Sequence, residues 1–249
     1  MRLLYITLTV LVLTGCMGKA PVTDRSQIVF MSANEENAVG AKGYHEFLQK
    51  AKISTDKAQT ARVKRIGQRI AKAANRPDFN WEFNLIEDKK VNAWCMPGGK
   101  VVVYTGILAM AKNDDQLATV MAHEVSHALA RHGAERMSHQ QISSGVQQVA
   151  NILLGATAPA YTNAFNLAYG VGTQYGVMLP YGRSHEHEAD EIGIHLMHKA
   201  GYNINEAPKF WQNMKAANPN APMEFLSTHP SDEKRIKKIQ ETIQTLKKK

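Results

Sequence analysis

The sequence predicts an α+β fold that is mainly α-helical with one small β-sheet. Apolar side chains recur at three- and four-residue spacing along most of the chain, and three short segments between residues 81 and 104 read as β-strands. A length of 249 residues with 44% hydrophobic side chains suits one globular domain with a sizeable core. The formal net charge is +8, but the basic residues are scattered and no nucleic-acid motif accompanies them, so no nucleic-acid partner is expected.

The first residues resemble an export signal. Arg2 precedes the apolar run 3–13, which is too short to span a bilayer as a mature helix, and Cys16 closes a segment that resembles a bacterial lipobox. We expect a lipoprotein signal peptide over residues 1–15, an acylated Cys16, and a lipid-anchored tether over residues 16–30. The alternative is an ordinary secretory signal with an incidental cysteine. No Asp follows Cys16, which by enterobacterial sorting rules favours the outer membrane, facing the periplasm; the inner membrane and the cell surface are the alternatives.

The elements of the domain can be placed from caps, turns and periodicity. Ser32, with Glu35 three residues on, forms a capping box that begins a helix. Asn113 to Asp115 cap the central helix, which we expect to end near residues 131–133. Ser231 is expected as the N-cap of the last helix. The remaining expected bounds are helices over 32–51, 55–75, 106–112, 183–200 and 205–216, and strands over 81–85, 92–96 and 100–104.

The segment 118–131 carries the chemistry. Apolar side chains surround it, so we predict a buried helix, and it contains His123, Glu124 and His127 at the spacing His-Glu-x-x-His. Residues four apart share one helical face, so the two imidazoles can ligate one zinc ion, while Glu124 lies about 100° around the helix as a base for the attacking water. The alternative, a surface helix with solvated His and Glu, does not fit the apolar flanks. The spacing therefore predicts a zinc hydrolase.

A catalytic zinc ion usually takes a third protein ligand. The extended pattern with a third histidine fails, because Ala130 and Gly133 stand in place of its glycine and histidine. The remaining choice is a carboxylate of the helix expected over 183–200. Glu186 and Asp190 share one face, so we assign Glu186 to the metal and Asp190 to the orientation of a ligand histidine, whereas Glu188 is turned about 200° from Glu186. The candidate carboxylates of this helix, from which Glu186 is chosen as the ligand, are Glu186, Glu188, Asp190 and Glu191.

With these residues in place, the chain resembles a known family. It is similar to the gluzincin zinc metallopeptidases that include the CAAX prenyl endopeptidases, the bacterial heat-shock membrane protease and the mitochondrial inner-membrane stress protease, and it looks like their bacterial lipoprotein branch. The resemblance covers about residues 30–245. It implies a zincin-like metallopeptidase domain over 31–249 with one Zn²⁺ per chain. The order Arg183-Ser184 is the reverse of the family's usual order. The resemblance depends on His123-Glu124-x-x-His127, Glu186-x-Glu188-Ala189-Asp190, Thr228-His229-Pro230-Ser231 ahead of Arg235, and the stretch from Asn92-Ala93 to Gly106.

The resemblance adds two further site expectations. His229 precedes the last helix, and in the lipoprotein branch this histidine lies near the zinc, where it either stabilises the oxyanion or occupies the water position and keeps the enzyme latent. Zinc peptidases commonly hold the substrate as a strand added to an edge strand. The candidate strand contributes Asn92, Ala93 and Trp94, and a purely structural sheet is the alternative. No metal role is expected for His132, His139, His185, His187, His195 and His198.

The expected function is zinc-dependent endopeptidase cleavage of misfolded or damaged envelope proteins, with Glu124 taking the proton from water. A chaperone or assembly factor for outer-membrane proteins is the first alternative, and a peptidoglycan amidase the second. The segment 137–182 contains no Asp, Glu, Lys or Arg. We expect packed helices or a partly mobile lid there, and a membrane-contacting element is the alternative. Cys95 is expected to be a small buried hydrophobe without a disulfide partner. The oligomeric state cannot be predicted.

Overall fold

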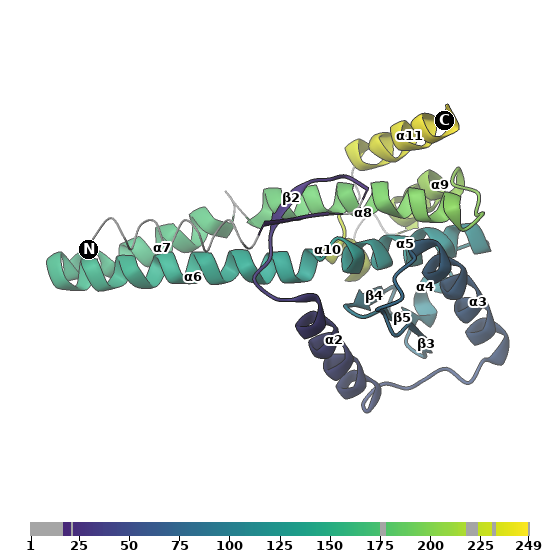
Figure 1. The fold of residues 1–249 in the computed structure, drawn as a ribbon, viewed down its shortest axis with the longest axis horizontal. Coiled ribbons are helices and arrows are strands. Elements are labelled where there is room, and N and C mark those ends of the chain that lie inside the picture. Colours follow the sequence, from purple (N-terminus) through teal and green to yellow (C-terminus); the bar gives the residue numbers. More distant parts are fainter. Residues whose placement is uncertain (1–16, 21, 175–177, 218–223, 231–232, 249) are drawn as a thin grey trace.

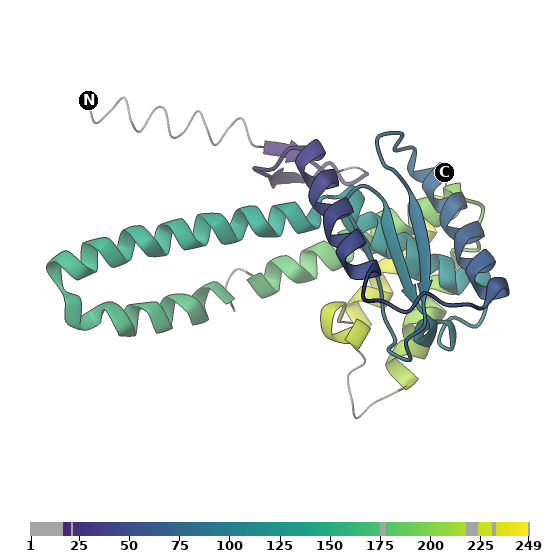
Figure 2. The same cartoon turned by 90° about the horizontal axis from the view of Figure 1, so that it is seen from below.

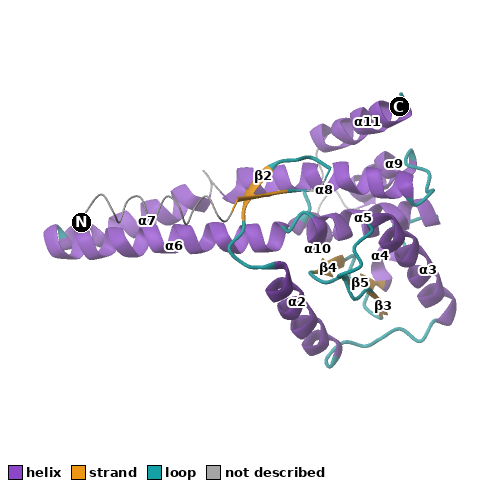
Figure 3. Cartoon of the chain, viewed as in Figure 1, coloured by secondary structure: helices purple, strands orange, loops and turns teal. Residues whose placement is uncertain are grey.

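The computed structural model describes residues 17–20, 22–174, 178–217, 224–230 and 233–248. A helical body surrounds one small sheet, and a long helical hairpin projects from it (Figures 1 and 2). Colouring by secondary structure shows how little of the chain is strand (Figure 3). The predicted fold class, mainly α with a small sheet, is therefore confirmed. The expected signal peptide and Cys16 lie outside the described residues.

The N-terminal part holds a β-ribbon that the sequence did not indicate. Strands β1 (Met17–Lys19) and β2 (Ser26–Ile28) pair antiparallel within the segment expected to be a tether. Helix α2 (Ala33–Leu48) follows, with Ser32 and Glu35 forming the predicted capping box. It ends at Leu48 rather than near residue 51.

The sheet has the strand order β3-β5-β4. Strand β3 (Glu82–Ile86) runs parallel to β5 (Lys100–Tyr104), and β4 (Ala93–Met96) pairs antiparallel with β5, so the strands expected over 92–96 and 100–104 form a hairpin. Its turn contains Gly98 and Gly99 at φ 79° and 80°, a region that glycine enters without a steric penalty. Helix α3 (Lys57–Ala74) packs against β3, and α4 (Thr105–Leu108) is shorter than the helix expected over 106–112.

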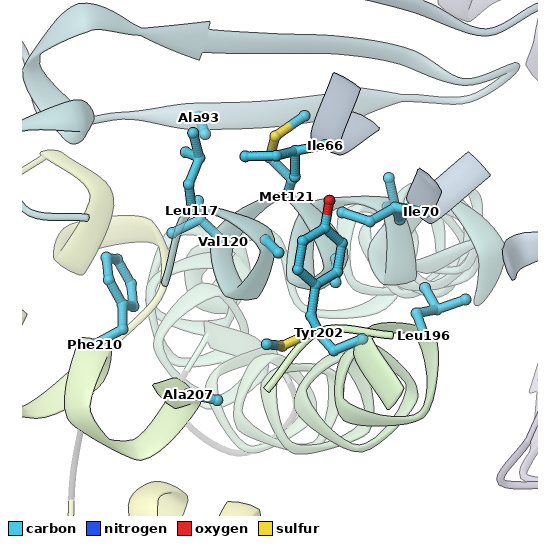
Figure 4. Packing of buried hydrophobic residues seen from close by; sticks show 14 of the residues in the cluster. Ile66, Ile70, Ala93, Leu117, Val120, Met121, Leu196, Tyr202, Ala207 and Phe210 are labelled. Atoms are coloured by element: carbon cyan, nitrogen blue, oxygen red, sulfur yellow. The ribbon is translucent and has the colours of Figure 1, made fainter. Parts of the chain in front are cut away.

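Helix α5 (Asp114–Leu129) is the centre of the core. Asn113 caps it as predicted, and almost every residue along it is buried. Figure 4 shows its apolar side chains between the sheet and α3 on one side and α8 (Leu179–Lys199) and α9 (Glu206–Ala217) on the other. Helix α8 starts before the expected residue 183.

Helix α5 was predicted to end near residues 131–133, and it ends slightly earlier, at Leu129. Arg131 takes the left-handed conformation, at φ 58°, and α6 (His132–Thr157) begins directly after it. The Arg131 Nε donates to Glu36 Oε2 at 3.0 Å and its Nη2 donates to the Met31 carbonyl at 2.5 Å. These tertiary contacts hold Arg131 in a conformation that non-glycine residues seldom adopt.

The charge-free segment forms a hairpin of α6 and α7 (Thr162–Thr173), joined by a short 3₁₀ turn at Pro159–Tyr161. The prediction of helices that pack together is confirmed within the hairpin, where Gln147 Nε2 donates to Asn166 Oδ1 at 2.9 Å. Much of its surface is exposed and apolar. Among the described helices, none combines the length and hydropathy that a membrane span requires. The exposed apolar side chains of the hairpin include Val146, Val149, Ile152, Leu153, Tyr161, Leu167 and Val171.

The chain ends with α10 (Glu224–Thr228), which was not predicted, and α11 (Glu233–Lys247). Ile236, Ile239 and Ile243 bury the apolar stripe of α11 against the body. The expected N-cap Ser231 lies outside the described residues.

Candidate active site

Two histidines of α5 and one glutamate of α8 come together where these two helices pack. His123 Nε2 and His127 Nε2 lie 3.1 Å apart, as the helical spacing predicts for side chains one turn apart. Glu186 reaches both, with Oε2 at 3.2 Å from His123 Nε2 and Oε1 at 3.4 Å from His127 Nε2. Helices α5 and α8 approach closely here because Gly193 faces the backbone of His123: a Cβ at Gly193 would lie 3.3 Å from the His123 nitrogen.

His229 joins this group from the loop after α10. Its Nδ1 lies 3.2 Å from His123 Nε2 and 3.0 Å from Glu186 Oε2. Its backbone N–H donates to the Phe225 carbonyl at 2.8 Å, and the two rings pack 4.8 Å apart. One ligand atom from each of the four side chains lies within 4.8 Å of the others, so the structure brings together His123, His127, Glu186 and His229.

Asp190 lies behind His123, where the sequence placed it. Its Oδ1 is 3.0 Å from His123 Nδ1, the ring nitrogen that faces away from the cluster. Arg235 of α11 donates from Nε to Asp190 Oδ2 at 2.5 Å and pairs with Glu186 Oε2 at 3.1 Å, while its guanidinium lies 3.8 Å over the Trp211 ring. No role for Arg235 was predicted. It stands four residues before Ile239, and an arginine on the apolar stripe of the last helix is the signal in the sequence that could have indicated one.

Three further residues stand behind His127. His132 Nδ1 lies 2.9 Å from His127 Nδ1, and His132 Nε2 lies 3.0 Å from Glu188 Oε2. Arg25, between the two strands of the N-terminal ribbon, donates from Nε to Glu188 Oε2 at 2.7 Å. Glu188 is turned away from the metal-ligand group, as expected. The expectation that His132 has no metal role stays a prediction for direct ligation, but the ring contacts a ligand candidate.

The electrostatics of the group favour a positive charge between its members. Burial and Arg235 lower the pKa of His123, but its hydrogen bonds to the carboxylates of Asp190 and Glu186 outweigh them and raise it. Burial alone would raise the pKa of Glu186, yet its hydrogen bonds to His123, His127 and His229 hold it well below its ordinary value. Burial lowers the pKa of His127 well below its ordinary value, and that of His132 to about 4, so both rings are neutral near pH 7.

Glu124 lies beside the group and is not part of it. Burial raises the pKa of its carboxyl to about 7, which suits a residue that takes and returns a proton near neutral pH. Its Oε1 accepts no hydrogen bond within the described residues, and it lies 3.4 Å from His229 Nε2. A buried carboxylate without a full set of partners is costly in a purely structural role.

The side chains fit a zinc ion. Asp190 faces His123 Nδ1 and His132 faces His127 Nδ1, so both rings direct their Nε2 atoms into the group, 3.1 Å apart. The carboxylate of Glu186 faces both Nε2 atoms. Imidazole nitrogens with one carboxylate form a donor set that zinc prefers in hydrolases.

The expected substrate strand packs against α5, the helix that carries His123 and His127. Strand β4 is an edge of the three-stranded sheet and packs against α5. Ala93 is buried in the core, and Trp94 packs its ring 4.9 Å from Phe47 of α2. Asn92 Oδ1 accepts from the Ala93 N–H at 2.8 Å. These side chains and the Ala93 N–H are engaged within the fold, and the role of this strand in substrate binding stays a prediction. Cys95 is half-buried and packs against the core without a disulfide.

Comparison with known proteins agrees with this geometry. The sequence profile described as "Peptidase family M48" matches residues 57–243, which is more than half of the chain. The chain is 34% identical over 226 residues to mitochondrial metalloendopeptidase OMA1 of Schizosaccharomyces pombe, covering 89% of this chain and 65% of that protein. It is 32% identical to the Saccharomyces cerevisiae protein of the same name, covering 90% of this chain and 68% of the relative.

A second group of relatives is bacterial. The chain is 31% identical over 211 residues to the beta-barrel assembly-enhancing protease of Escherichia coli strain K12, covering 83% of this chain and 43% of that protein. The chain therefore spans between about two fifths and two thirds of the length of these three relatives.

Proposed function

This chain belongs to peptidase family M48, and on that premise we propose that it is a zinc-dependent endopeptidase that cleaves misfolded or damaged proteins of the cell envelope. One observation carries the proposal: two imidazoles and a carboxylate converge on one point, and the buried Glu124 stands beside them with a pKa of about 7. A site that only stabilised the fold would not need Glu124 in this position.

We assign His123, His127 and Glu186 as ligands of one Zn²⁺, with Asp190 orienting His123. A zinc ion held there supplies Lewis acidity to the scissile carbonyl and to the attacking water. Glu124 accepts the proton of that water as it attacks and then delivers the proton to the leaving amine. Burial assists both steps, because a carboxyl with a pKa near 7 exchanges protons easily at neutral pH. The edge strand that Asn92, Ala93 and Trp94 belong to aligns the substrate as an added strand.

His229 is assigned to latency rather than to oxyanion stabilisation. Its Nδ1 lies among the ligand atoms, 3.2 Å from His123 Nε2, and its Nε2 faces Glu124 at 3.4 Å. A side chain in this place competes with substrate and water for the same space, so the arrangement fits a resting enzyme that a movement of the loop after α10 activates.

The location is proposed from the sequence. A signal peptide over residues 1–15 and an acylated Cys16 anchor the domain to the outer membrane on its periplasmic side. Support comes from the bacterial relatives named as assembly-enhancing for β-barrels. The substrates are then unfolded or misfolded envelope proteins.

A second candidate is an assembly factor for outer-membrane proteins with little proteolysis. The exposed apolar side chains of the charge-free hairpin favour it, since such a surface can hold unfolded chains. The intact set of Glu124 and three ligands favours the endopeptidase.

The test is Glu124→Gln in the full chain loaded with zinc, assayed on unfolded casein. We expect the rate to fall about 10²–10⁴-fold, the usual contribution of a general base, with zinc binding unchanged. The exposed Glu46, changed to Gln, is the matched control and should keep the wild-type rate. A folded, zinc-bound Glu124→Gln protein that cleaves casein as fast as the wild type would refute the assignment.

A further inference from the structure

The N-terminal ribbon reaches the metal-ligand group through a chain of buried side chains. Arg25 contacts Glu188, Glu188 contacts His132, and His132 contacts the ligand candidate His127, at 2.7, 3.0 and 2.9 Å. The four residues come from three separate parts of the fold: the ribbon, the α5–α6 corner and α8. Only Arg25 has appreciable solvent exposure, with 25% of its side chain accessible.

The carboxylate of Glu188 fixes the direction of the hydrogen bonds that connect it to His132 and His127. Glu188 can only accept, so the proton of the neutral His132 ring must sit on Nε2, which faces it. His132 Nδ1 then carries a lone pair and can only accept from His127 Nδ1. His127 consequently keeps its proton on Nδ1 and points the lone pair of Nε2 at the ligand group. This is the tautomer that ligation through Nε2 requires.

Arg25 holds the carboxylate in place. Its Nε donates to Glu188, and its two Nη groups donate to Glu135 at 2.9 and 2.7 Å, so one guanidinium ties two buried carboxylates. The Thr23 hydroxyl donates to the other oxygen of Glu188. His185, whose ring stacks on His132 at 4.0 Å, contacts Glu135 at 3.0 Å. Every polar atom of Glu188 is thereby engaged, and its orientation toward His132 is set from the ribbon.

We propose that Arg25 is a positioning residue for the metal site: through Glu188 and His132 it fixes the tautomer and the orientation of His127. The inference rests on the proposed function, because it takes His127 as a zinc ligand. Asp190 performs the same task for His123 from the opposite side. The contacts behind His127 differ in that they include a second histidine and lead to the N-terminal ribbon.

The experiment measures the zinc affinity of the full chain by competition with a chromophoric chelator. Loss of an outer partner of a ligand histidine typically weakens metal binding 10–100-fold, so Arg25→Ala and Glu188→Ala should each bind zinc at least about tenfold more weakly than the wild type. Arg62→Ala is the matched control. Arg62 also ties a carboxylate of α5 across a partly exposed ion pair, to Asp114 at 2.7 Å, but at the far end of the helix from the histidines. The Arg62→Ala variant should bind zinc with the affinity of the wild type.

A second readout separates positioning from general support of the fold. Nitrogen-15 NMR of the histidines in the zinc-loaded wild type should show His132 protonated on Nε2 and not on Nδ1. The opposite tautomer would overturn the proposal, and so would a folded Arg25→Ala protein with wild-type zinc affinity. If Arg25→Ala does not fold, Arg25→Lys carries the same test, since one ammonium cannot reproduce the fork that joins Glu188 and Glu135. A wild-type chain that binds no zinc would instead contradict the proposed function.

Discussion

His123 illustrates how several elements decide the chemistry of one residue. Its helix gives it a position one turn from His127, α8 supplies Glu186 and Asp190 to its two nitrogens, and α11 supplies Arg235. Arg235 carries a positive charge into a buried site that already holds three carboxylates. It offsets only one of the two negative charges of Asp190 and Glu186, which it contacts, so the remaining negative charge favours one more cation between the rings.

His229 is where the proposed latency can be tested. Replacing it with Ala removes a ring whose Nδ1 lies 3.2 Å from His123 Nε2 and whose Nε2 faces Glu124. We expect His229→Ala to cleave unfolded casein severalfold faster than the wild type and to bind zinc more weakly. The double variant with Glu124→Gln should be inactive, which ties the gain to Glu124. A fall in the rate at saturating casein would show instead that His229 stabilises the transition state.

The part of the site that the sequence could predict is the part encoded locally. His123, Glu124 and His127 lie within five positions of one helix, and Glu186 and Asp190 lie one turn apart on another, so helical geometry alone places them. The series of contacts behind His127 depends on residues far apart in the sequence: His132 and Glu188 are 56 positions apart, and Arg25 and Glu188 are 163 apart. A histidine outside a spacing pattern gives no sign that it will contact a ligand once the chain has folded.

At the scale of elements, the contact of α5 with α8 brings the ligands together, and Gly193 allows it. A Cβ there would lie 3.3 Å from the His123 nitrogen, whereas a Cβ at Gly155 of α6 would meet nothing within 4 Å. Both glycines are inside helices, where Ala is otherwise better by about 0.5–1 kcal/mol.

We therefore expect opposite effects of the same change. Gly155→Ala should leave stability unchanged or raise it by up to about 1 kcal/mol. Gly193→Ala should lower the free energy of unfolding by about 1–3 kcal/mol, the usual cost of overpacking, and weaken zinc binding, because α8 must move away from His123. Urea unfolding and chelator competition measure the two quantities. Equal stability of the two variants would show that the helices can separate at no cost to the site.

Element boundaries show where local signals fail. Ser32 and Asn113 cap their helices through side-chain contacts within three positions, and the sequence predicted both. The corner between α5 and α6 is set by Arg131, which bonds to Glu36 and Met31 about a hundred positions earlier. The sequence predicted an end near residues 131–133, but Gly133 lies inside α6, because these long-range bonds fix the corner at Arg131.

At the scale of the molecule, the ligands come from parts of the fold that are distant in sequence. The group takes His123 and His127 from α5, Glu186 from α8 and His229 from the loop after α10, so it exists only when these elements are packed together. A zinc ion that binds the packed state and not the unfolded chain adds its binding free energy to stability. Among the described residues, the hairpin of α6 and α7, which projects away from the body in Figure 1, contributes no member of this group.

Removal of the metal should consequently lower the melting temperature. With free zinc at about a thousand times its dissociation constant, binding contributes about 4 kcal/mol, and for a chain of this size each kcal/mol shifts Tm by about 2–4 °C. We expect a strong chelator to lower Tm by about 8–16 °C, measured by calorimetry on the full chain, and added zinc to restore it. The variant His127→Ala should melt at the same temperature with and without the chelator, because its site has lost a ligand. A wild-type Tm that the chelator does not change would mean that the four converging side chains are held by their own hydrogen bonds, since no binding energy would then be coupled to folding.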